Sequence, residues 1–234
     1  MSTSNDVLDA ARACLLRSDG RKITLAEVAR EAGVSRPTVY RRWPEVSSVI
    51  RDLLTREMAQ IIAEHRVHID NAAREAAEAL SVNSRSSVDV LDRGAPPAGL
   101  LPDTTRRAVL DALIDTTVGV AVAVGEDAVF ESLGRMQPEV IAPYIFTRLG
   151  TSQRGVLTVL TEAIVAAQSF DAIRPGQAEH LAAMVLLIAQ SAIQSRAMMA
   201  PILGAAWPGE LRIALTGYLC PTDTDHPRTH GDLT

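Results

Sequence analysis

The chain has 234 residues, of which 47% are hydrophobic but only 3% aromatic, so its core must be built from aliphatic side chains, as in many all-α proteins. Its two cysteines, Cys14 and Cys220, are far apart and have no metal-ligand spacing, which favours reduced thiols in the cytoplasm over a disulfide or zinc scaffold. No apolar run approaches the roughly 18 residues of a membrane span. We therefore expect a cytoplasmic protein with no membrane partner, no metal and no cofactor.

The charges are unevenly distributed along the chain. The formal net charge is −5, yet residues 1–60 contain ten basic and eight acidic residues, whereas the remainder contains 13 basic and 20 acidic residues. This distribution indicates two regions with different electrostatic roles, and the basic region is compatible with nucleic-acid binding.

An apolar helix is predicted over about residues 7–16, and a shorter helix with marked ends follows it. Thr24 and Glu27 form the capping-box pattern, which predicts a helix that starts at Leu25. Gly33 follows the last apolar position, where a left-handed residue ends a helix at least cost. Between these signals, helical spacing predicts one buried face made of Leu25, Val28, Ala29 and Ala32.

A second short helix is predicted directly after Gly33. Ser35 is a good N-cap, and Pro37 fits the first turn, where its missing N–H leaves no helical hydrogen bond unmade. Val39 and Trp43 are four residues apart and can pack back on the first helix. Two short helices joined by a tight turn form a helix-turn-helix.

The second helix of such a motif presents its N-terminal residues to base edges in the major groove. We expect Arg36 to read a base, because a guanidinium can donate to guanine O6 and N7 together. Thr38, Tyr40 and one of the two following arginines are better suited to phosphate contacts. The alternative is an ordinary helical hairpin with a solvated basic face. The candidate DNA-binding residues are Thr24, Ser35, Arg36, Pro37, Thr38, Tyr40, Arg41 and Arg42.

The run ITLAEVAREAGVSRPTVYRRWP, with the apolar helix before it, resembles the DNA-binding domain of TetR-type transcriptional repressors over about residues 5–60. Its serine, proline, threonine and tyrosine have the spacing of that family's recognition helix. The resemblance implies a homodimer, a pseudo-palindromic double-stranded DNA operator, and a helical second part that encloses an inducer. Val46 departs from the pattern, because the family often has a phosphate-binding lysine near this point. Either that contact is weaker here, or Arg41, Arg42 or Arg51 provides it.

Helices are predicted for most of the remaining chain. The segment 83–103 is rich in serine, proline and glycine and predicts a loop, either a lid over a pocket or a mobile connection. The polar tail at 221–234 is expected to be disordered. The predicted helices are at about 46–66, 71–82, 104–124, 128–136, 139–149, 151–167, 176–200 and 209–219. The predicted domains are a helix-turn-helix DNA-binding domain (5–48) and a helical regulatory and dimerisation domain (49–220).

The predicted helix at 176–200 is apolar nearly all the way round, which is unusual for a helix on a protein surface. It lies either in the middle of a monomer core or between a core and a second subunit. The second reading fits better, because alanines such as Ala182, Ala189 and Ala197 permit close helix packing. We expect this helix and the one at 209–219 to form a four-helix interface in a two-fold dimer.

The acidic region is expected to bind a small apolar effector. Its candidate wall residues are Met136, Tyr144, Phe146, Met184, Gln190 and Gln194, with ordinary core packing as the alternative for the methionines and aromatic residues. No nucleophile with a base and no paired carboxylates suggest an enzyme. The sequence therefore predicts a ligand-responsive DNA-binding regulator that acts as a repressor. The alternatives are a DNA-binding regulator that acts through protein partners without an inducer, and a helical enzyme with an incidental basic hairpin.

Overall fold

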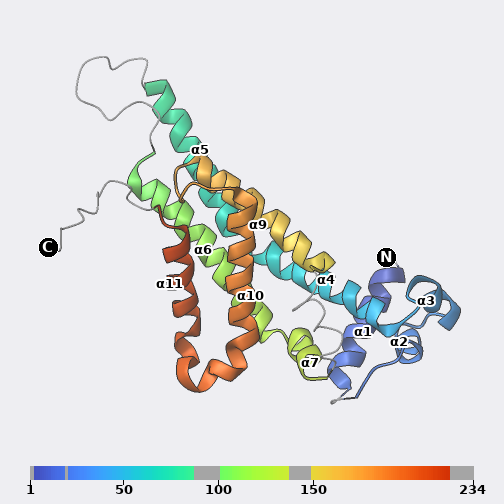
Figure 1. Cartoon of the computed structure of the whole chain (residues 1–234). Coiled ribbons are helices and arrows are strands. Elements are labelled where there is room, and N and C mark those ends of the chain that lie inside the picture. Colours follow the sequence, from blue (N-terminus) through green and yellow to red (C-terminus); the bar gives the residue numbers. More distant parts are fainter. Residues whose placement is uncertain (1–2, 19–20, 87–100, 137–148, 222–234) are drawn as a thin grey trace.

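A computed structural model describes residues 3–18, 21–86, 101–136 and 149–221 (Figure 1). The described residues form helices and no strands, so the predicted all-α fold class is confirmed. The helices are α1 (Thr3–Arg17), α2 (Leu25–Glu31), α3 (Arg36–Arg42), α4 (Val46–His65), α5 (Val67–Ser86), α6 (Asp103–Glu126), α7 (Ala128–Met136), α9 (Thr151–Ser169), α10 (Ala178–Leu203) and α11 (Trp207–Leu219), with one 3-10 turn, η1 (Gly204–Ala206).

The N-terminal unit consists of α1, α2, α3 and the first half of α4, at one end of the molecule (Figure 1). Most of its core comes from these four helices. Of the predicted buried face, Leu25, Val28 and Ala29 are buried here, and Ala32 is half-buried against them. Two further core side chains, Val129 and Leu133, come from α7 and are completely buried. The core of this unit is therefore completed by a helix that is remote in the sequence and packs on α1.

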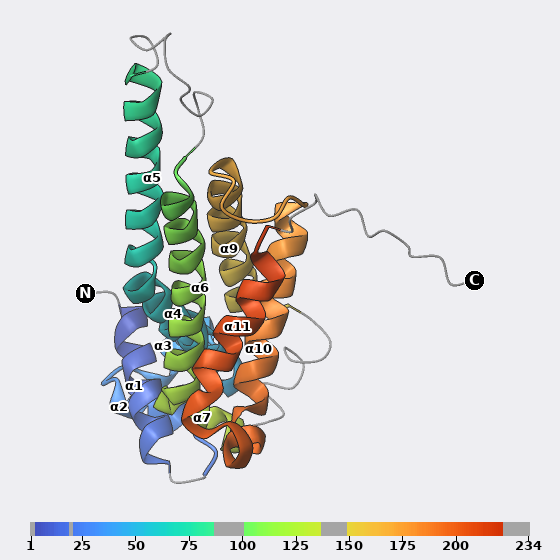
Figure 2. The same ribbon diagram turned by 90° about the vertical axis from the view of Figure 1, so that its left-hand side faces the viewer.

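The second unit is a bundle of α5, α6, α9, α10 and α11, which run side by side in Figure 2. α6 is central, because it contacts each of the other four helices as well as α4 and α7. By length and composition alone, α6 and the segment 178–219 could cross a membrane, but the core helices of soluble proteins pass the same test. Central packing accounts for the apolar character of α6.

Several helices extend beyond their predicted bounds. α5 continues through residues 83–86, because serine and asparagine disfavour a helix only weakly. α10 passes Pro201 and ends at Leu203, since a proline in the last turn removes only one helical hydrogen bond. Gly204, with φ +47°, then ends the helix. The predicted helix at 139–149, apart from Leu149, and most of the predicted tail lie outside the described residues.

Candidate DNA-binding surface and effector cavity

α2 begins at the predicted capping box. The backbone N–H of Thr24 donates to Oε2 of Glu27 at 2.8 Å, and the backbone N–H of Glu27 donates to Oγ1 of Thr24 at 3.2 Å. Arg21 also pairs with Glu27, at 2.7 Å. The hydrogen bond from the Thr24 backbone and that from Arg21 lower the pKa of Glu27. Thr24, a candidate DNA contact, therefore has its side chain engaged in holding the first turn of α2.

The turn after α2 is a Schellman motif. The N–H of Gly33 donates to the carbonyl of Arg30 at 3.2 Å, and the N–H of Val34 donates to the carbonyl of Ala29 at 3.0 Å. Gly33 has φ +65°, and a Cβ built on it would meet no heavy atom within 4 Å. The requirement for glycine is therefore conformational rather than steric. This motif sets the direction in which the chain enters α3.

α3 is held by its N-cap and by two buried side chains. The hydroxyl Oγ of Ser35 accepts from the backbone N–H of Thr38 at 3.4 Å and bonds to Oγ1 of Thr38 at 2.7 Å. Val39 is completely buried, and Trp43 nearly so. Nε1 of Trp43 donates to Oδ2 of Asp52 at 2.8 Å, which ties the end of α3 to α4. The orientation of α3 is thus fixed from the side of α2 and from the side of α4.

The opposite face of α3 is exposed and basic. Tyr40 presents 47% of its surface to solvent, and α3 contains no acidic residue. The guanidinium carbon of Arg42 lies 5.0 Å from the centroid of the Trp43 ring, which orients this side chain by a cation–π contact. The residues predicted to contact DNA that are exposed together here are Ser35, Arg36, Pro37, Tyr40, Arg41 and Arg42, with Thr38 half-buried beside them.

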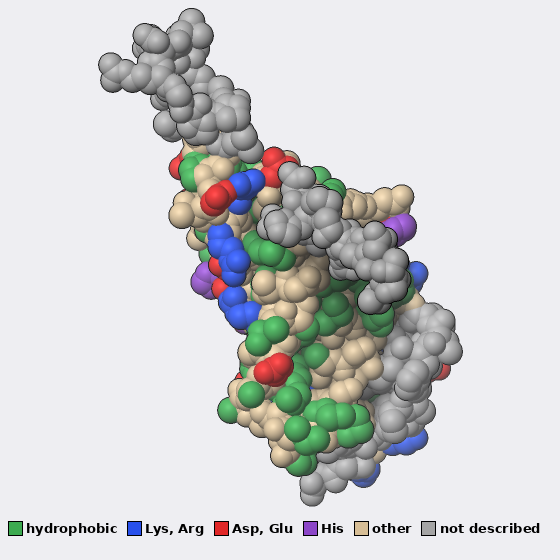
Figure 3. All heavy atoms as spheres, turned by 60° about the vertical axis from the view of Figure 1, so that its left-hand side comes forward, with side chains coloured by type: hydrophobic (Ala, Val, Ile, Leu, Met, Phe, Trp, Pro, Cys, Tyr) green, Lys and Arg blue, Asp and Glu red, His purple; other side chains and the backbone are tan. Residues whose placement is uncertain are grey.

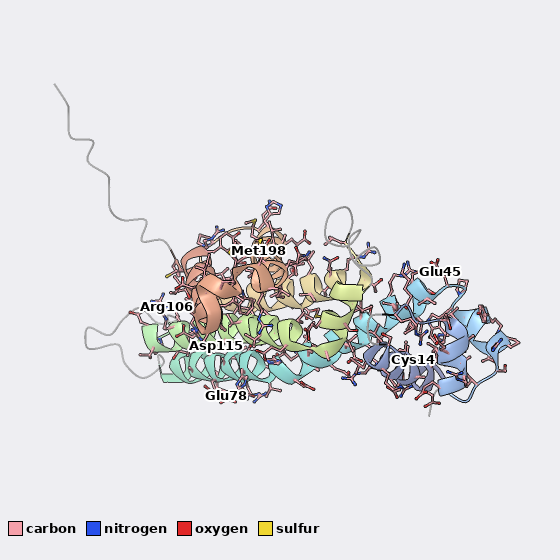
Figure 4. The ribbon with its side chains drawn as sticks, turned by 90° about the horizontal axis from the view of Figure 1, so that it is seen from below. Cys14, Glu45, Glu78, Arg106, Asp115 and Met198 are labelled. Atoms are coloured by element: carbon pink, nitrogen blue, oxygen red, sulfur yellow. The ribbon has the colours of Figure 1, made fainter. Side chains whose placement is uncertain are left out.

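Apart from Arg42, which stacks on Trp43, the arginines of the N-terminal unit fall into two groups. Five of them pair with carboxylates, namely Arg12, Arg17, Arg21, Arg51 and Arg56. Within the described parts of the chain, Arg36 and Arg41 of α3, like Arg30 of α2, have no ion-pair or hydrogen-bond partner for their side chains. All five donors of each guanidinium are therefore available for phosphates or bases. Arg51, considered above for a phosphate contact, lies 3.8 Å from Glu45, which Figure 4 labels at the edge of the N-terminal unit.

A cavity of about 1760 Å³ lies against α4, α5, α6, α7, α9 and α10. Ligand pockets usually measure about 300–1,000 Å³, so this one could hold a sizeable small molecule. Its lining surface is mostly apolar and runs from Trp43, at the end of α3, to Trp207, at the start of α11. These are the only tryptophans of the chain.

Two sets of polar contacts join α10 to other parts of the cavity wall. The backbone N–H of Gly150 donates to Oε1 of Gln153 at 2.8 Å, and Nε2 of Gln153 donates to Oε1 of Gln190 at 2.8 Å. Arg196 of α10 donates to the carbonyl of Gly125 at 2.5 Å and pairs with Glu126 at 3.3 Å. A cation at this position stabilises the carboxyl end of α6 and holds it to α10.

Two helices belong to both the cavity wall and the N-terminal core. On α7, Phe130 and Gly134 line the cavity, whereas Val129 and Leu133 are buried in the N-terminal core. The same division occurs along α4, where Val49, Ile50 and Leu53 are buried in the N-terminal core, whereas residues on another face of the helix, from Ser48 to Ile62, line the cavity. A change in the shape of the cavity would therefore move helices that also pack in the core supporting α2 and α3.

The comparisons with known proteins agree with this architecture. Residues 7–45 match the model for bacterial regulatory proteins of the tetR family. An HTH-type transcriptional regulator of Mycobacterium tuberculosis strain H37Rv is 37% identical over 228 residues, which cover 94% of this chain and 100% of the relative. The chain belongs to the TetR family of bacterial transcriptional regulators.

Two further proteins resemble this TetR-family chain, one in sequence and one in fold. The HTH-type transcriptional regulator AqdR of Rhodococcus erythropolis is 43% identical over 56 residues, 24% of this chain and 27% of AqdR. The structure of the R. erythropolis transcriptional repressor QsdR, from the TetR family, has a TM-score of 0.53 at 14% identity, and the match covers 96% of this chain and 98% of QsdR. The shared feature with QsdR is the fold.

The candidate effector residues are only partly brought together by this TetR-family fold. Gln190 and Gln194 lie one turn apart on α10 and both line the cavity. Met184 is exposed and is not among the lining residues, because it lies on another face of the same helix. The side chain of Met136, and Tyr144 and Phe146, lie outside the part of the chain whose side chains are described.

The outer face of α10 and α11 is almost free of charge. Exposed residues repeat along α10 at intervals of three and four, namely Met184, Leu187, Ser191, Gln194, Met198 and Ile202, of which Gln194 also borders the cavity. Ile213 continues the apolar surface on α11, between Gly209 and Gly217, whose outer sides meet nothing within 4 Å. Figure 3 shows hydrophobic side chains over this face with few charges among them, and Figure 4 labels Met198 there. We call this surface the α10–α11 face.

Sequence reasoning missed the contacts that join distant segments. The Trp43–Asp52 hydrogen bond and the Gln153–Gln190 hydrogen bond involve residues 9 and 37 positions apart, respectively. A buried tryptophan needs a hydrogen-bond acceptor for its N–H, so the first contact had a signal in the sequence, although not the identity of the partner. No pattern in the sequence indicated the Gln153–Gln190 contact.

Proposed function

We propose that the protein is a homodimeric repressor that binds a pseudo-palindromic operator through α3 of each protomer and is released by a small effector bound in the cavity. The observation that carries this proposal is the division of α3 into a buried face, formed by Val39, and an exposed face whose Arg36 and Arg41 are unpaired among the described residues. A basic helix that is rigidly supported on one side and unpaired on the other is suited to a DNA groove. We infer that the protein works in the cytoplasm.

In the proposed complex, Arg36 donates to a guanine, and Tyr40 and Arg41 contact phosphates. Arg36 is the first residue of α3, and the N-terminal end of the recognition helix is the part that contacts base edges. Tyr40 and Arg41 lie one turn further along on exposed positions. Phosphate contacts fix the register of the helix, whereas the guanine contact supplies the specificity.

The α10–α11 face supports the proposal of a two-fold dimer. An exposed apolar stripe over a long helix is costly for a monomer in water, and a second copy with the same stripe would cover it. The outward glycines Gly209 and Gly217 are consistent with a close helix approach, since glycine inside a helix otherwise lowers stability. In such a dimer, two α3 helices about 34–36 Å apart would reach successive major grooves.

The effector would act by stabilising a conformer in which the two α3 helices no longer match successive grooves. A ligand shifts such an equilibrium only by its difference in affinity for the two conformers. α4 and α7 provide the connection, because each lines the cavity with some residues and supports the N-terminal unit with others. The apolar cavity favours a small-molecule effector over a regulator that acts only through protein partners.

The test is binding to DNA fragments, starting with the region upstream of the protein's own gene, by footprinting and gel shift. We expect Arg36→Ala to weaken binding about tenfold to a hundredfold, the range of one bidentate base contact. Tyr40→Ala should also weaken it, and neither change should lower the melting temperature, because both side chains are exposed. Binding of the unchanged protein should fall steeply with salt.

Arg74→Ala is the matched control, because it removes the same charge from an exposed position on α5, outside the N-terminal unit. This control should bind DNA as the unchanged protein does. If Arg36→Ala and Tyr40→Ala both bound the protected fragment with unaltered affinity, α3 would not be the reading helix.

A further inference from the structure

We propose that the effector is an uncharged, flexible aliphatic molecule that carries a hydrogen-bond acceptor, such as an ester or a ketone, and that the side-chain amide of Gln190 holds this acceptor. The inference rests on the proposed function, since it concerns the occupant of the effector cavity.

The first step is the direction of the hydrogen bonds on the cavity wall. A backbone N–H can only donate, so the Gln153 atom that accepts from Gly150 at 2.8 Å must be the carbonyl oxygen Oε1. The other atom, Nε2 of Gln153, must then donate, and Gln190 must turn its own Oε1 toward it at 2.8 Å. The orientations of both amides, which are often ambiguous for glutamine, therefore follow from the backbone of Gly150.

The second step is that Gln190 is left with a donor. Its Nε2 group carries two N–H bonds and has no acceptor within the described ranges. Gln190 is half-buried and lines the cavity. A ligand oxygen that accepts from this group would satisfy it, whereas an ammonium head would have to share Oε1 of Gln190 with Gln153. The wall therefore favours a ligand with an acceptor.

The third step is the charge of the lining. The described residues around the cavity include five arginines and five carboxylates, which leaves no formal net charge; they are Arg42, Arg51, Arg66, Arg154, Arg196, Asp52, Asp70, Glu126, Glu131 and Glu162. Arg66 pairs with Asp70 at 3.0 Å, and Arg196 pairs with Glu126 at 3.3 Å. A charged ligand would lose its hydration without gaining a matching excess charge, so a neutral ligand is favoured.

The fourth step is the shape of the apolar surface near Gln190. The apolar lining residues within one or two turns of Gln190 on α10 are Leu186, Ala189, Ile193 and Ala197, beside the polar Gln194 and Arg196. α9 contributes Val156, Val159, Leu160 and Ala163 to the same wall. Small and branched aliphatic groups pack well against a flexible chain, and these two helices offer no aromatic ring to the cavity on which a flat ligand could stack.

The two tryptophans provide a direct readout, because both line the cavity and the chain has no others. Methyl decanoate, decanoate and decylammonium have the same hydrocarbon chain but an acceptor, an anionic and a donor head, respectively. We expect methyl decanoate to change the tryptophan fluorescence saturably and to bind more tightly than the other two. In a parallel gel shift, methyl decanoate should release the protected DNA fragment.

Two variants test the role of Gln190. Gln190→Leu removes the donor, and Gln190→Glu removes the donor but keeps an oxygen that accepts from Gln153, which protects the fold. Each should weaken binding of methyl decanoate about threefold to tenfold, the usual effect of one neutral hydrogen bond. Gln177→Leu is the matched control, because Gln177 is exposed at the start of the same helix and makes no capping hydrogen bond. This control should bind as the unchanged protein does.

Equal binding of decylammonium and methyl decanoate, or unaltered binding by both Gln190 variants, would overturn the inference about the acceptor. The proposed function would survive that result if the bound probe still released DNA. Binding of none of the three probes, in a protein that still protects its DNA fragment, would refute the aliphatic class and leave the DNA-binding part of the proposal intact. If the unchanged protein protected no DNA fragment at all, that result would instead count against the proposed function.

Discussion

Ile202→Glu should separate the proposed dimer. Ile202 presents 80% of its surface in a single protomer, at the C-terminal end of the exposed stripe on α10. Complete burial of an isoleucine side chain is worth about 1.5–3 kcal/mol, so covering this share contributes about 1.2–2.4 kcal/mol. Two-fold symmetry repeats the contact, which raises the loss to about 2.4–4.8 kcal/mol and the dissociation constant by roughly 50-fold to 3,000-fold. Burial of two carboxylates would add to this loss.

Sedimentation equilibrium over a range of concentrations measures this change, and a gel shift should show weaker DNA binding in parallel. Ile202→Glu should lower the melting temperature only by the amount that loss of the dimer accounts for, because Ile202 supports little of the protomer's own core. Val165→Glu, at a 54% exposed position on α9, is the control and should leave the dimer intact. A dimer constant unaffected by Ile202→Glu would mean that this end of the α10–α11 face does not join protomers.

Two further predictions concern the helix-turn-helix. Gly33→Ala should lower the free energy of unfolding by about 1 kcal/mol, because φ +65° is unfavourable for alanine. Gly155→Ala inside α9 is the control and should raise it by about 0.5–1 kcal/mol, because a Cβ there meets nothing within 4 Å. Urea denaturation measures both free energies, and equal effects would contradict the conformational role of Gly33. The lowered pKa of Glu27 means that its stabilising contribution is present above the ordinary value of 4.5 and is lost as the pH falls through the lowered folded value. The melting temperature should therefore fall less on acidification in Glu27→Gln than in the unchanged protein, and parallel pH profiles would refute this role.

The helix-turn-helix was predictable because its signals are local. The capping box at Thr24, the left-handed Gly33 and the cap at Ser35 each act within four residues, and all three occur as predicted. Which residues of α10 face the cavity and which face solvent was not predictable. This helix is apolar on every side, so the sequence could not show that Met184 is exposed while Gln190 faces the cavity. Periodicity identifies a buried face only where a polar face contrasts with it.

The packing of α7 was also beyond sequence reasoning. A helix is predicted at residues 128–136, and a helix is present there. Nothing in the pattern shows that Val129 and Leu133 pack on α1, more than 100 residues away, because periodicity indicates that a face is buried but not which surface covers it. The cavity depends on the same long-range packing, so its position could not be predicted either.

The contribution of α7 to the N-terminal core has a consequence for protein engineering. A fragment that ended after α4 would lack Val129 and Leu133, and the apolar surface that they cover on α1 would be open to water. A chimera that joined this N-terminal unit to the second unit of a related regulator would meet the same difficulty. Its designer would have to transfer α7 together with the N-terminal unit, or redesign the foreign α7 to pack on α1, before the hybrid could serve as a biosensor.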